Sequence, residues 1–274
     1  VATVGVPDLP QSLAVNHSTH RVYVAHNVIN VVSVVDGISN TAVATIPVGN
    51  GPIGVAVNPV TNRIYIANLT DATVSVIDGA TNKVTATIDV STLALGFGGG
   101  RPLLLGTNPT TNRIYVGLAS SRGGSVVAID GHTNTVTAII ETGGRPSGVA
   151  VNPETNYVYA TDQYNNAVLV IDGATNTFVA SIPVPSAPRS IAVNPVTNLV
   201  YAVSSASQIV SVIDGLTNTV AASIAFCCSP SGVAVNAATN RIYVTNPGVA
   251  VVHVVDGATN AVVAAVSCIG IGNC

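Results

Sequence analysis

The sequence has little charge and contains neither methionine nor tryptophan. Only 8% of its 274 residues are charged, and its net charge is −3, with Lys83 as the one lysine. Nucleic-acid binding needs a basic surface, which this composition excludes. No apolar run approaches the roughly 18 residues of a transmembrane helix. We therefore expect neither a nucleic-acid partner nor a membrane span.

The absence of methionine also bears on where the protein is found. Translation starts with methionine, so a chain that begins at Val1 is expected to be a processed product or a trimmed chain, with removal of a secretory signal peptide as the favoured reason. Two Asn-x-Ser/Thr sequons, at Asn16 and Asn68, are candidates for glycosylation in a secreted protein. A weakly charged surface has little self-repulsion, which favours association. We expect a secreted or cell-surface protein that associates with itself.

Four cysteines lie in the C-terminal part of the chain, at Cys227, Cys228, Cys268 and Cys274. An even number of cysteines fits disulfides formed in an oxidising compartment. We expect one of the adjacent pair to bridge to Cys268 and the other to Cys274, within the tail 269–274. A ring between Cys227 and Cys228 and a thiolate metal site are the open alternatives.

Six copies of one repeat fill the chain. Each has a Gly-Val-Ala-Val-Asn-Pro-like run, a Thr-Asn-Arg-Ile-Tyr-like run and an Asp-Gly turn. The turn aspartate recurs at positions 36, 78, 130, 172, 214 and 256, with a spacing of 42 residues except for 52 between the second and third. Short alternating apolar runs in a repeat of this length are typical of a four-stranded β-propeller blade. The sequence predicts a single all-β, six-bladed propeller domain. Its approximate blades are 7–48, 49–90, 91–141, 142–184, 185–226 and 227–268.

Within a repeat, most charged residues have a structural interpretation. Repeat two predicts strands a to d at 54–57, 63–68, 73–77 and 83–88, joined in an antiparallel meander. In the Asp-Gly turn the aspartate can accept backbone hydrogen bonds and the glycine can supply a positive φ. The asparagine that ends each turn tolerates the left-handed conformation. Six of the ten aspartates and four of the eight arginines occupy such repeated positions. We interpret them as architectural.

A tyrosine recurs at one position in strand b, at residues 23, 65, 115, 159, 201 and 243. The last copy reads Tyr243-Val244-Thr245-Asn246. The repeats resemble the YVTN family of β-propeller proteins over essentially the whole chain. The resemblance implies a secreted or surface propeller, because the family is common in surface-layer and exported proteins. Relatives of similar build include lyases and cofactor-bearing dehydrogenases.

The two ends of the blades differ in how much they vary. The a–b and c–d turns are nearly constant, whereas the b–c and d–a loops vary in length and residue type, and variable loops are where binding residues usually lie. Three d–a loops carry Arg101, Arg145 and Arg189, which suit a carboxylate or a phosphate. Arg122 and Asp162, in b–c loops, complete the candidate ligand-binding set. An anion or sugar-acid site is one interpretation, and charges paired across neighbouring loops are the other.

Catalytic motifs are sparse. Of the five histidines only His26 reaches the variable loops, so the sequence predicts no three-histidine metal cage. No Gly-x-Ser-x-Gly nucleophile motif occurs. We predict no catalytic residue, no metal and no cofactor. The enzyme alternative is a lyase or lactonase-like activity that holds an anionic substrate with the three loop arginines.

The strand count leaves one strand over. Residues 1–16 align without gaps to 43–58, so 1–6 is predicted to be a d-type strand. The last repeat already has its own d strand at 261–267. An unpaired strand edge promotes association. One outcome is that the last blade takes a fifth strand, or that disulfides hold an outer strand against it. The other is that the surplus strand adds to a blade in a neighbouring subunit, and this contact, repeated head to tail, builds a filament.

These observations favour a non-enzymatic extracellular or cell-surface module with a structural or interaction role. Self-association through the terminal strands is the expected partnership. A protein or glycan partner on the variable loops is the remaining class.

Overall fold

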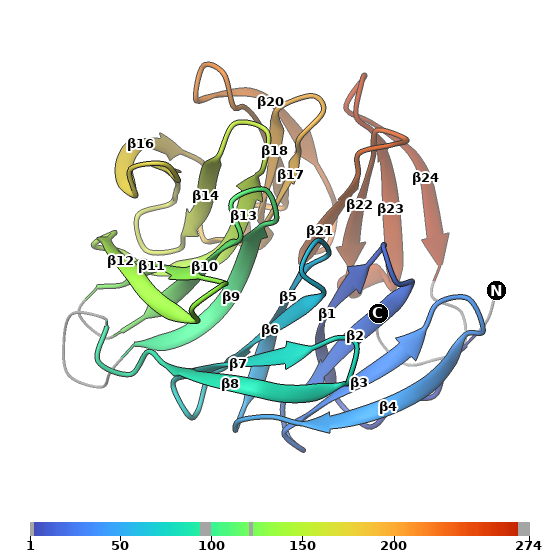
Figure 1. Cartoon of the computed structure of the whole chain (residues 1–274). Coiled ribbons are helices and arrows are strands. Elements are labelled where there is room, and N and C mark those ends of the chain that lie inside the picture. Colours follow the sequence, from blue (N-terminus) through green and yellow to red (C-terminus); the bar gives the residue numbers. More distant parts are fainter. Residues whose placement is uncertain (1–2, 94–99, 121–122, 268–274) are drawn as a thin grey trace. The chain divides into compact units, whose positions relative to one another are not determined.

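The short apolar runs of each repeat form strands in the computed structural model of the chain (Figure 1). The structure describes residues 3–93, 100–120 and 123–267. In this part of the chain, consecutive strands form six four-stranded antiparallel sheets. The fold is therefore the all-β, six-bladed propeller that the repeat predicts.

The chain divides into two compact units, residues 1–143 and 144–274. The first unit holds blade one, with β1 (Pro10–Asn16), β2 (Arg21–His26), β3 (Val31–Asp36) and β4 (Thr41–Pro47). It also holds blade two, with β5 (Pro52–Asn58), β6 (Arg63–Asn68), β7 (Thr73–Asp78) and β8 (Lys83–Asp89), and blade three, with β9 (Arg101–Asn108), β10 (Arg113–Ala119), β11 (Ser125–Asp130) and β12 (Thr135–Glu141).

The second unit begins with blade four, formed by β13 (Pro146–Asn152), β14 (Tyr157–Asp162), β15 (Ala167–Asp172) and β16 (Thr177–Pro183). Blade five has β17 (Pro188–Asn194), β18 (Leu199–Ser204), the 3-10 turn η1 (Ser205–Ser207), β19 (Ile209–Asp214) and β20 (Thr219–Ala225). Blade six has β21 (Gly232–Asn236), β22 (Arg241–Asn246), the 3-10 turn η2 (Pro247–Val249), β23 (Val251–Asp256) and β24 (Ala261–Ser267).

The turn between the third and fourth strands is held by its aspartate. In blade two, Asp78 Oδ1 accepts hydrogen bonds from the backbone N–H groups of Ala80 at 2.9 Å and Thr81 at 3.0 Å. Asn82, which ends the turn, has a left-handed backbone with a φ of 54°. Both features are the ones predicted for this turn from its residue types.

The glycine of this turn has a different role from the predicted one. Among the described glycines only Gly51, Gly123 and Gly143 have a positive φ, so Gly79 does not supply a left-handed conformation. Instead, a Cβ on Gly79 would lie 2.3 Å from Asn62 Oδ1 and 2.9 Å from its backbone oxygen. Glycine is needed here because the first turn of the same blade packs directly against it.

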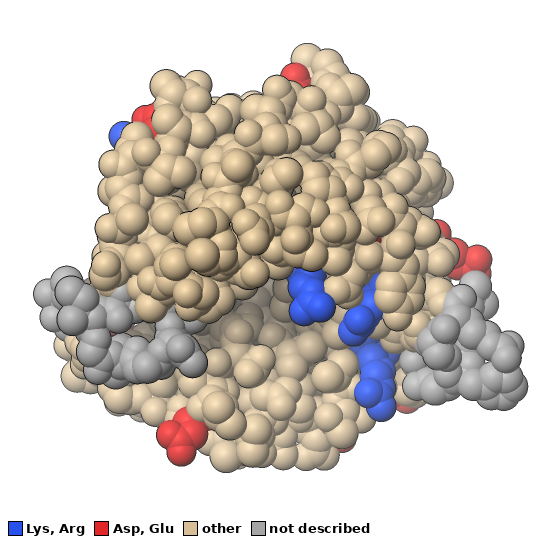
Figure 2. All heavy atoms as spheres, turned by 180° about the vertical axis from the view of Figure 1, so that it is seen from behind, with Lys and Arg blue, Asp and Glu red and all other residues tan. Residues whose placement is uncertain are grey.

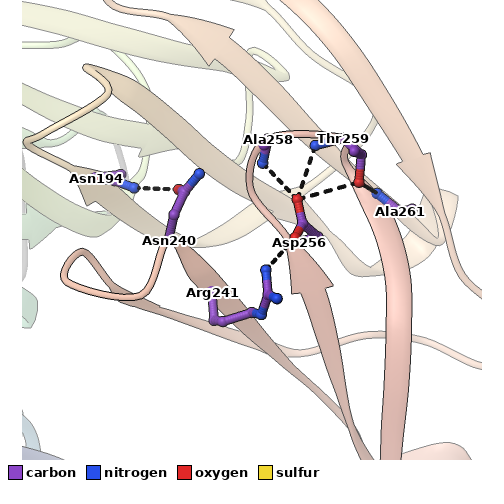
Figure 3. A network of polar contacts seen from close by, with 7 residues as sticks. All are labelled: Asn194, Asn240, Arg241, Asp256, Ala258, Thr259 and Ala261. Carbon is purple, nitrogen blue, oxygen red and sulfur yellow. Dashed lines mark hydrogen bonds and ion pairs between the residues drawn. The ribbon is translucent and has the colours of Figure 1, made fainter.

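Buried asparagines connect successive blades within each unit. Asn16, which ends β1, is fully buried, and its Nδ2 donates to Asn62 Oδ1 in blade two at 2.8 Å. The same pair recurs as Asn58–Asn112 at 2.8 Å, Asn152–Asn198 at 2.7 Å and Asn194–Asn240 at 2.8 Å, the last of which is drawn in Figure 3. Leaving a buried amide unpaired costs about 1–3 kcal/mol, so these pairs help to set the register of one blade on the next.

The repeated tyrosine fills the space between neighbouring sheets. Five of the six copies, at positions 23, 65, 115, 159 and 201, are fully buried, whereas Tyr243 in blade six is 37% exposed. Burial raises the pKa of Tyr65 and Tyr159 to about 12. Tyr65 of blade two shares an apolar cluster with Ile114 and Ile129 of blade three. The core therefore consists of layers between successive blades.

Three of the four arginines that open a second strand pair with the turn aspartate of the same blade, while Arg113 Nη1 donates to Thr137 Oγ1 at 2.9 Å. The ion pairs are Arg21–Asp36 at 2.8 Å, Arg63–Asp78 at 3.5 Å, and Arg241–Asp256, which Figure 3 shows beside the turn amides. Partly exposed pairs of this kind contribute about 0–1 kcal/mol each. Their repeated positions support the architectural interpretation of these charges.

The turn aspartates make stability depend on pH. Backbone hydrogen bonds hold the pKa of Asp36, Asp78 and Asp130 below its usual range. Because the folded pKa is the lower one, these carboxylates stabilise the folded chain above about pH 4, and this stabilisation is lost as the pH falls. We expect the melting temperature to decrease between about pH 5 and pH 3. Asp78→Asn should reduce the decrease, since an amide oxygen accepts the same bonds without titrating. Differential scanning calorimetry measures both, and a flat profile would contradict the assignment.

The strand predicted over residues 1–6 is not formed in the described part of the chain. Residues 3–9 lie outside any strand and β1 begins at Pro10, while residues 1–2 lie outside the described residues. Blade six has its own fourth strand, β24, which pairs with β23 along its whole length. The backbone groups of residues 3–9 therefore lie outside the strand ladders of the described residues.

Candidate functional site

The variable loops of blades four and five meet at the start of β13 and β17. Ser147 Oγ lies 3.3 Å from the backbone oxygen of Pro188, to which it donates, and Thr161 Oγ1 donates to the backbone oxygen of Arg189 at 3.2 Å. Arg145 is two residues before Ser147, and Arg189 directly follows Pro188. Two of the predicted ligand-binding arginines therefore stand beside one inter-blade junction, within the second unit.

The side chain of Arg145 is oriented by two neutral groups. Its Nη1 donates to Gln163 Oε1 at 3.2 Å, and its guanidinium carbon lies 6.0 Å from the ring centre of Tyr164. The backbone N–H of Gln163 returns a hydrogen bond to the Arg145 oxygen at 3.1 Å. Tyr164 is 60% exposed. An arginine that is held by an amide and an aromatic ring keeps its full positive charge for a ligand.

Asp162 has a structural role rather than the predicted ligand-binding one. Its side chain is fully buried, and Oδ1 accepts from the backbone N–H groups of Arg145 at 3.0 Å, Tyr164 at 3.1 Å and Asn165 at 3.2 Å. Its Oδ2 accepts from Asn165 Nδ2 at 2.7 Å. A Cβ on Gly144 would lie 1.9 Å from this carboxylate, so the loop closes tightly over it. Asp162 therefore fixes the loop that carries Arg145 and cannot also face a ligand.

The loop arginines have no carboxylate partner among the residues that the structure describes. The ion pairs of residues 3–93, 100–120 and 123–267 are the three at the Asp-Gly turns. Arg101 in the first unit and Arg189 in the second are exposed, and Arg122 lies outside the described residues. In Figure 2 several Lys and Arg side chains gather toward the centre right of the face shown, while another at the upper left lies beside an acidic side chain. The predicted alternative, pairing across neighbouring loops, is not found in this part of the chain.

His26 is a buried structural residue. It is fully buried, with Nε2 2.9 Å from Ser33 Oγ and Nδ1 3.3 Å from the backbone oxygen of Asp8. In blade two the corresponding Asn68 makes the same kind of contact to Ser75. No group of three His, Cys, Asp or Glu side chains in the described residues is placed to hold a metal ion.

Both sequon asparagines are inaccessible in the folded chain. Asn16 and Asn68 are fully buried. Asn16 Nδ2 is bonded to Asn62, and Asn68 Nδ2 donates to Thr73 Oγ1 at 3.0 Å and Ser75 Oγ at 2.8 Å. Attachment of a sugar would break these bonds, so the structure argues against the predicted glycosylation.

The adjacent cysteines lie on the surface. Cys227 and Cys228 are exposed and free, and the side-chain hydrogen bond between them raises the pKa of the Cys228 thiol. Consecutive Cα atoms are about 3.8 Å apart, shorter than the 4.4 Å or more of ordinary disulfides, so a bridge between the two would be strained. Cys268 and Cys274 lie outside the described residues, and the predicted bridges to them stay a prediction.

A second candidate surface lies on the first and last blades, at positions that the inner blades bury. Val266 in β24 is 58% exposed, while its counterparts Ile46, Ile88, Ile140, Ile182 and Ile224 are 3–7% exposed. In β1, Leu13 is 60% exposed, against 6–9% for Val55, Leu105, Val149 and Ile191. We call Asn236, Tyr243 and Val266 the trailing face of blade six, and Leu13 and Val15 the leading face of blade one. Neither face can be recognised from its apolar residues in the sequence, because a valine or leucine of a terminal repeat has the same repeat position as one between two blades.

Comparisons with known proteins show the fold alone. No protein-family profile matches the chain, and no curated protein matches it in sequence. Similar solved structures include Kuenenia stuttgartiensis hydrazine synthase, with 17% identity and a TM-score of 0.82 over 95% of this chain and 88% of that one. Dihydro-heme d1 dehydrogenase NirN in complex with DHE has 14% identity and a TM-score of 0.72. Here the match covers 95% of this chain but only 57% of that one. At these identities the shared property is the β-propeller. No helix among the described residues is long and apolar enough to cross a membrane.

Proposed function

We propose that this chain is a non-enzymatic structural module of the YVTN propeller type, exported from the cell, which joins head to tail with further copies of itself. One observation supports the proposal: the first and last repeats carry the apolar residues Leu13 and Val266 at positions that pack between successive blades within a unit, as Val55 and Ile46 do in the first unit. Apolar faces of this kind favour association when a further copy covers them.

The inner blades show what each exposed face is built to contact. Ile46 of blade one and Val55 of blade two belong to one apolar cluster, which also contains Tyr23. Val266 and Leu13 have the positions of Ile46 and Val55 in the repeat. A trailing face on one copy therefore matches a leading face on another. Fully burying a valine or leucine is worth about 1.5–3 kcal/mol, so several such contacts can hold two copies together.

Polar groups of blades six and one also have the repeat positions of a hydrogen-bonded pair in the inner blades. Asn236 has the repeat position of Asn16, which donates to Asn62, but it is exposed. His20 replaces the asparagine in the first repeat, and it has a left-handed φ of 56° like Asn62. A neutral imidazole nitrogen can accept the hydrogen bond from the Asn236 amide. The contact unites two different surfaces, and such heterologous contacts continue into a filament unless they close into a ring.

The segment before β1 can add to this junction. Residues 3–8 match 45–50 in the repeat alignment and have no ladder partner within one copy. His26 contacts the Asp8 oxygen, and the other residues of this segment, which belong to no strand, are candidates to pair with a strand edge of another copy, as in β-strand addition. We also propose that disulfides join Cys227 and Cys228 to the C-terminal tail, because an exported protein folds in an oxidising compartment.

Leu13→Glu tests the head-to-tail contact. Placing an unpaired charge in the junction costs about 3 kcal/mol or more, so association should weaken roughly 100-fold. Val60→Glu is the matched control, because Val60 is 75% exposed on a turn outside both faces. Sedimentation velocity over a range of concentrations, with negative-stain imaging, measures the assemblies. Wild-type chain that stays monomeric throughout, or Leu13→Glu chain that assembles normally, contradicts the proposal.

A further inference from the structure

The loops of blades four and five carry an arrangement that self-association does not use. Arg145 is half-buried and fixed in position, Tyr164 presents an exposed ring 6.0 Å from it, and Arg189 is exposed at the start of β17, whose backbone Thr161 of blade four contacts. Three arginines elsewhere in the repeats, Arg21, Arg63 and Arg241, are paired with the turn aspartates. The geometry points to a binding site for an acidic sugar, a hexuronate unit of a polysaccharide, on Arg145, Tyr164 and Arg189.

The carboxylate of such a sugar is the part that the arginines recognise. A guanidinium offers planar pairs of N–H donors that match the two oxygens of a carboxylate. Gln163 occupies one donor of Arg145 and leaves the others free. The acidic side chain of this loop, Asp162, accepts its hydrogen bonds from loop amides and forms no ion pair with the Arg145 guanidinium. The fixed loop therefore keeps the guanidinium oriented, with no carboxylate at ion-pair distance among the described residues.

The remaining groups suit a sugar ring rather than a small inorganic anion. Tyr164 combines an aromatic face, on which the C–H groups of a sugar can lie, with a hydroxyl group. Gln163 has an amide that can bond to sugar hydroxyls. Neutral hydrogen-bond donors and acceptors around one or two arginines suit a ligand that has one carboxylate and many hydroxyl groups.

The site is preorganised by contacts inside the protein. Asp162 and Gly144 hold the loop of Arg145, and Thr161 Oγ1 holds the backbone of Arg189. Binding therefore requires little ordering of the backbone, which lowers the entropic cost of the complex. The affinity of a single sugar unit should be modest, and a chain of such units should bind more tightly by engaging several copies of the protein.

Isothermal titration calorimetry with oligogalacturonate tests the assignment, with maltooligosaccharide as the neutral sugar and inorganic phosphate as the sugar-free anion. We expect binding of oligogalacturonate only. Arg145→Gln should weaken it at least about tenfold, because a hydrogen bond to a charged group is worth about 1.5–3 kcal/mol. Tyr164→Ala should weaken it and Tyr164→Phe should not. Lys83→Gln, which removes the same charge from β8, should leave it unchanged.

Three results would overturn the inference. Failure of oligogalacturonate to bind at millimolar concentration would show that the proposed site does not exist. Binding that survives Arg145→Gln and Arg189→Gln together lies elsewhere on the protein. Equally strong binding of inorganic phosphate shows a general anion site rather than a sugar-acid site. Circular dichroism of each variant separates loss of binding from loss of fold, and titrations in the Leu13→Glu background separate this site from self-association.

Discussion

Replacing Tyr65 with alanine should destabilise the chain by about 3–5 kcal/mol, which is the usual cost of removing a large buried aromatic ring. Tyr65 is fully buried between blades two and three, where it packs with Ile114 and Ile129. Its ring lies in a layer that holds two sheets together, and a cavity there weakens both. Tyr243→Ala at the same repeat position should cost less than half as much, because that ring is 37% exposed.

The comparison is made by urea unfolding at a protein concentration at which the chain is monomeric. A lower midpoint with an unchanged slope identifies a loss of stability rather than a change in compactness. The two variants remove the same side chain from the same strand position, so each is the control for the other. Equal losses would show that the trailing face of blade six is covered in the single chain, which contradicts the proposed head-to-tail contact.

The local structure of each blade followed from the sequence. Strand positions, the hydrogen bonds of Asp78 and the left-handed Asn82 all depend on residues within one turn or one hairpin. Such features need only residue types and spacing, which a repeated sequence presents six times. The constancy of the turns also indicated correctly that most aspartates are architectural.

Features that join one blade to the next could not be predicted from residue types and spacing in the same way. The Asn16–Asn62 bond joins residues 46 positions apart, and the need for glycine at 79 comes from contact with Asn62 rather than from its φ. Asp162 was predicted to bind a ligand because its loop varies, yet burial turned its carboxylate toward the loop itself. Sequence position alone does not show which way a loop carboxylate points.

One signal of the terminal surfaces was present in the sequence. The residue that pairs with the preceding blade is asparagine in blades two and three, at Asn62 and Asn112, but His20 in blade one. A first repeat that lacks this asparagine has a leading face unlike those of the inner repeats. Leu13 and Val266 are the apolar residues that the first and last repeats place on these two faces.

Mixing two assembly-blocked variants should restore a single contact. Leu13→Glu removes the leading face and keeps the trailing face, whereas Val266→Glu does the reverse. Each variant alone should be monomeric, because every head-to-tail contact would bury an unpaired glutamate at a cost of about 3 kcal/mol or more. An equal mixture should form 1:1 dimers and nothing larger, since each dimer retains only blocked faces. Mass photometry or sedimentation velocity distinguishes monomers, dimers and longer assemblies.

The stoichiometry decides between kinds of association. A symmetric contact uses the same surface of both copies. A substitution in that surface would abolish association, a substitution elsewhere would leave it intact, and mixing the two variants would restore nothing. Contacts inside one chain would make both substitutions destabilise the monomer and leave the mixture monomeric. A capped dimer arises only when two different faces on two copies meet. That outcome would establish that the exposed apolar positions of blades one and six are the two halves of one repeating contact.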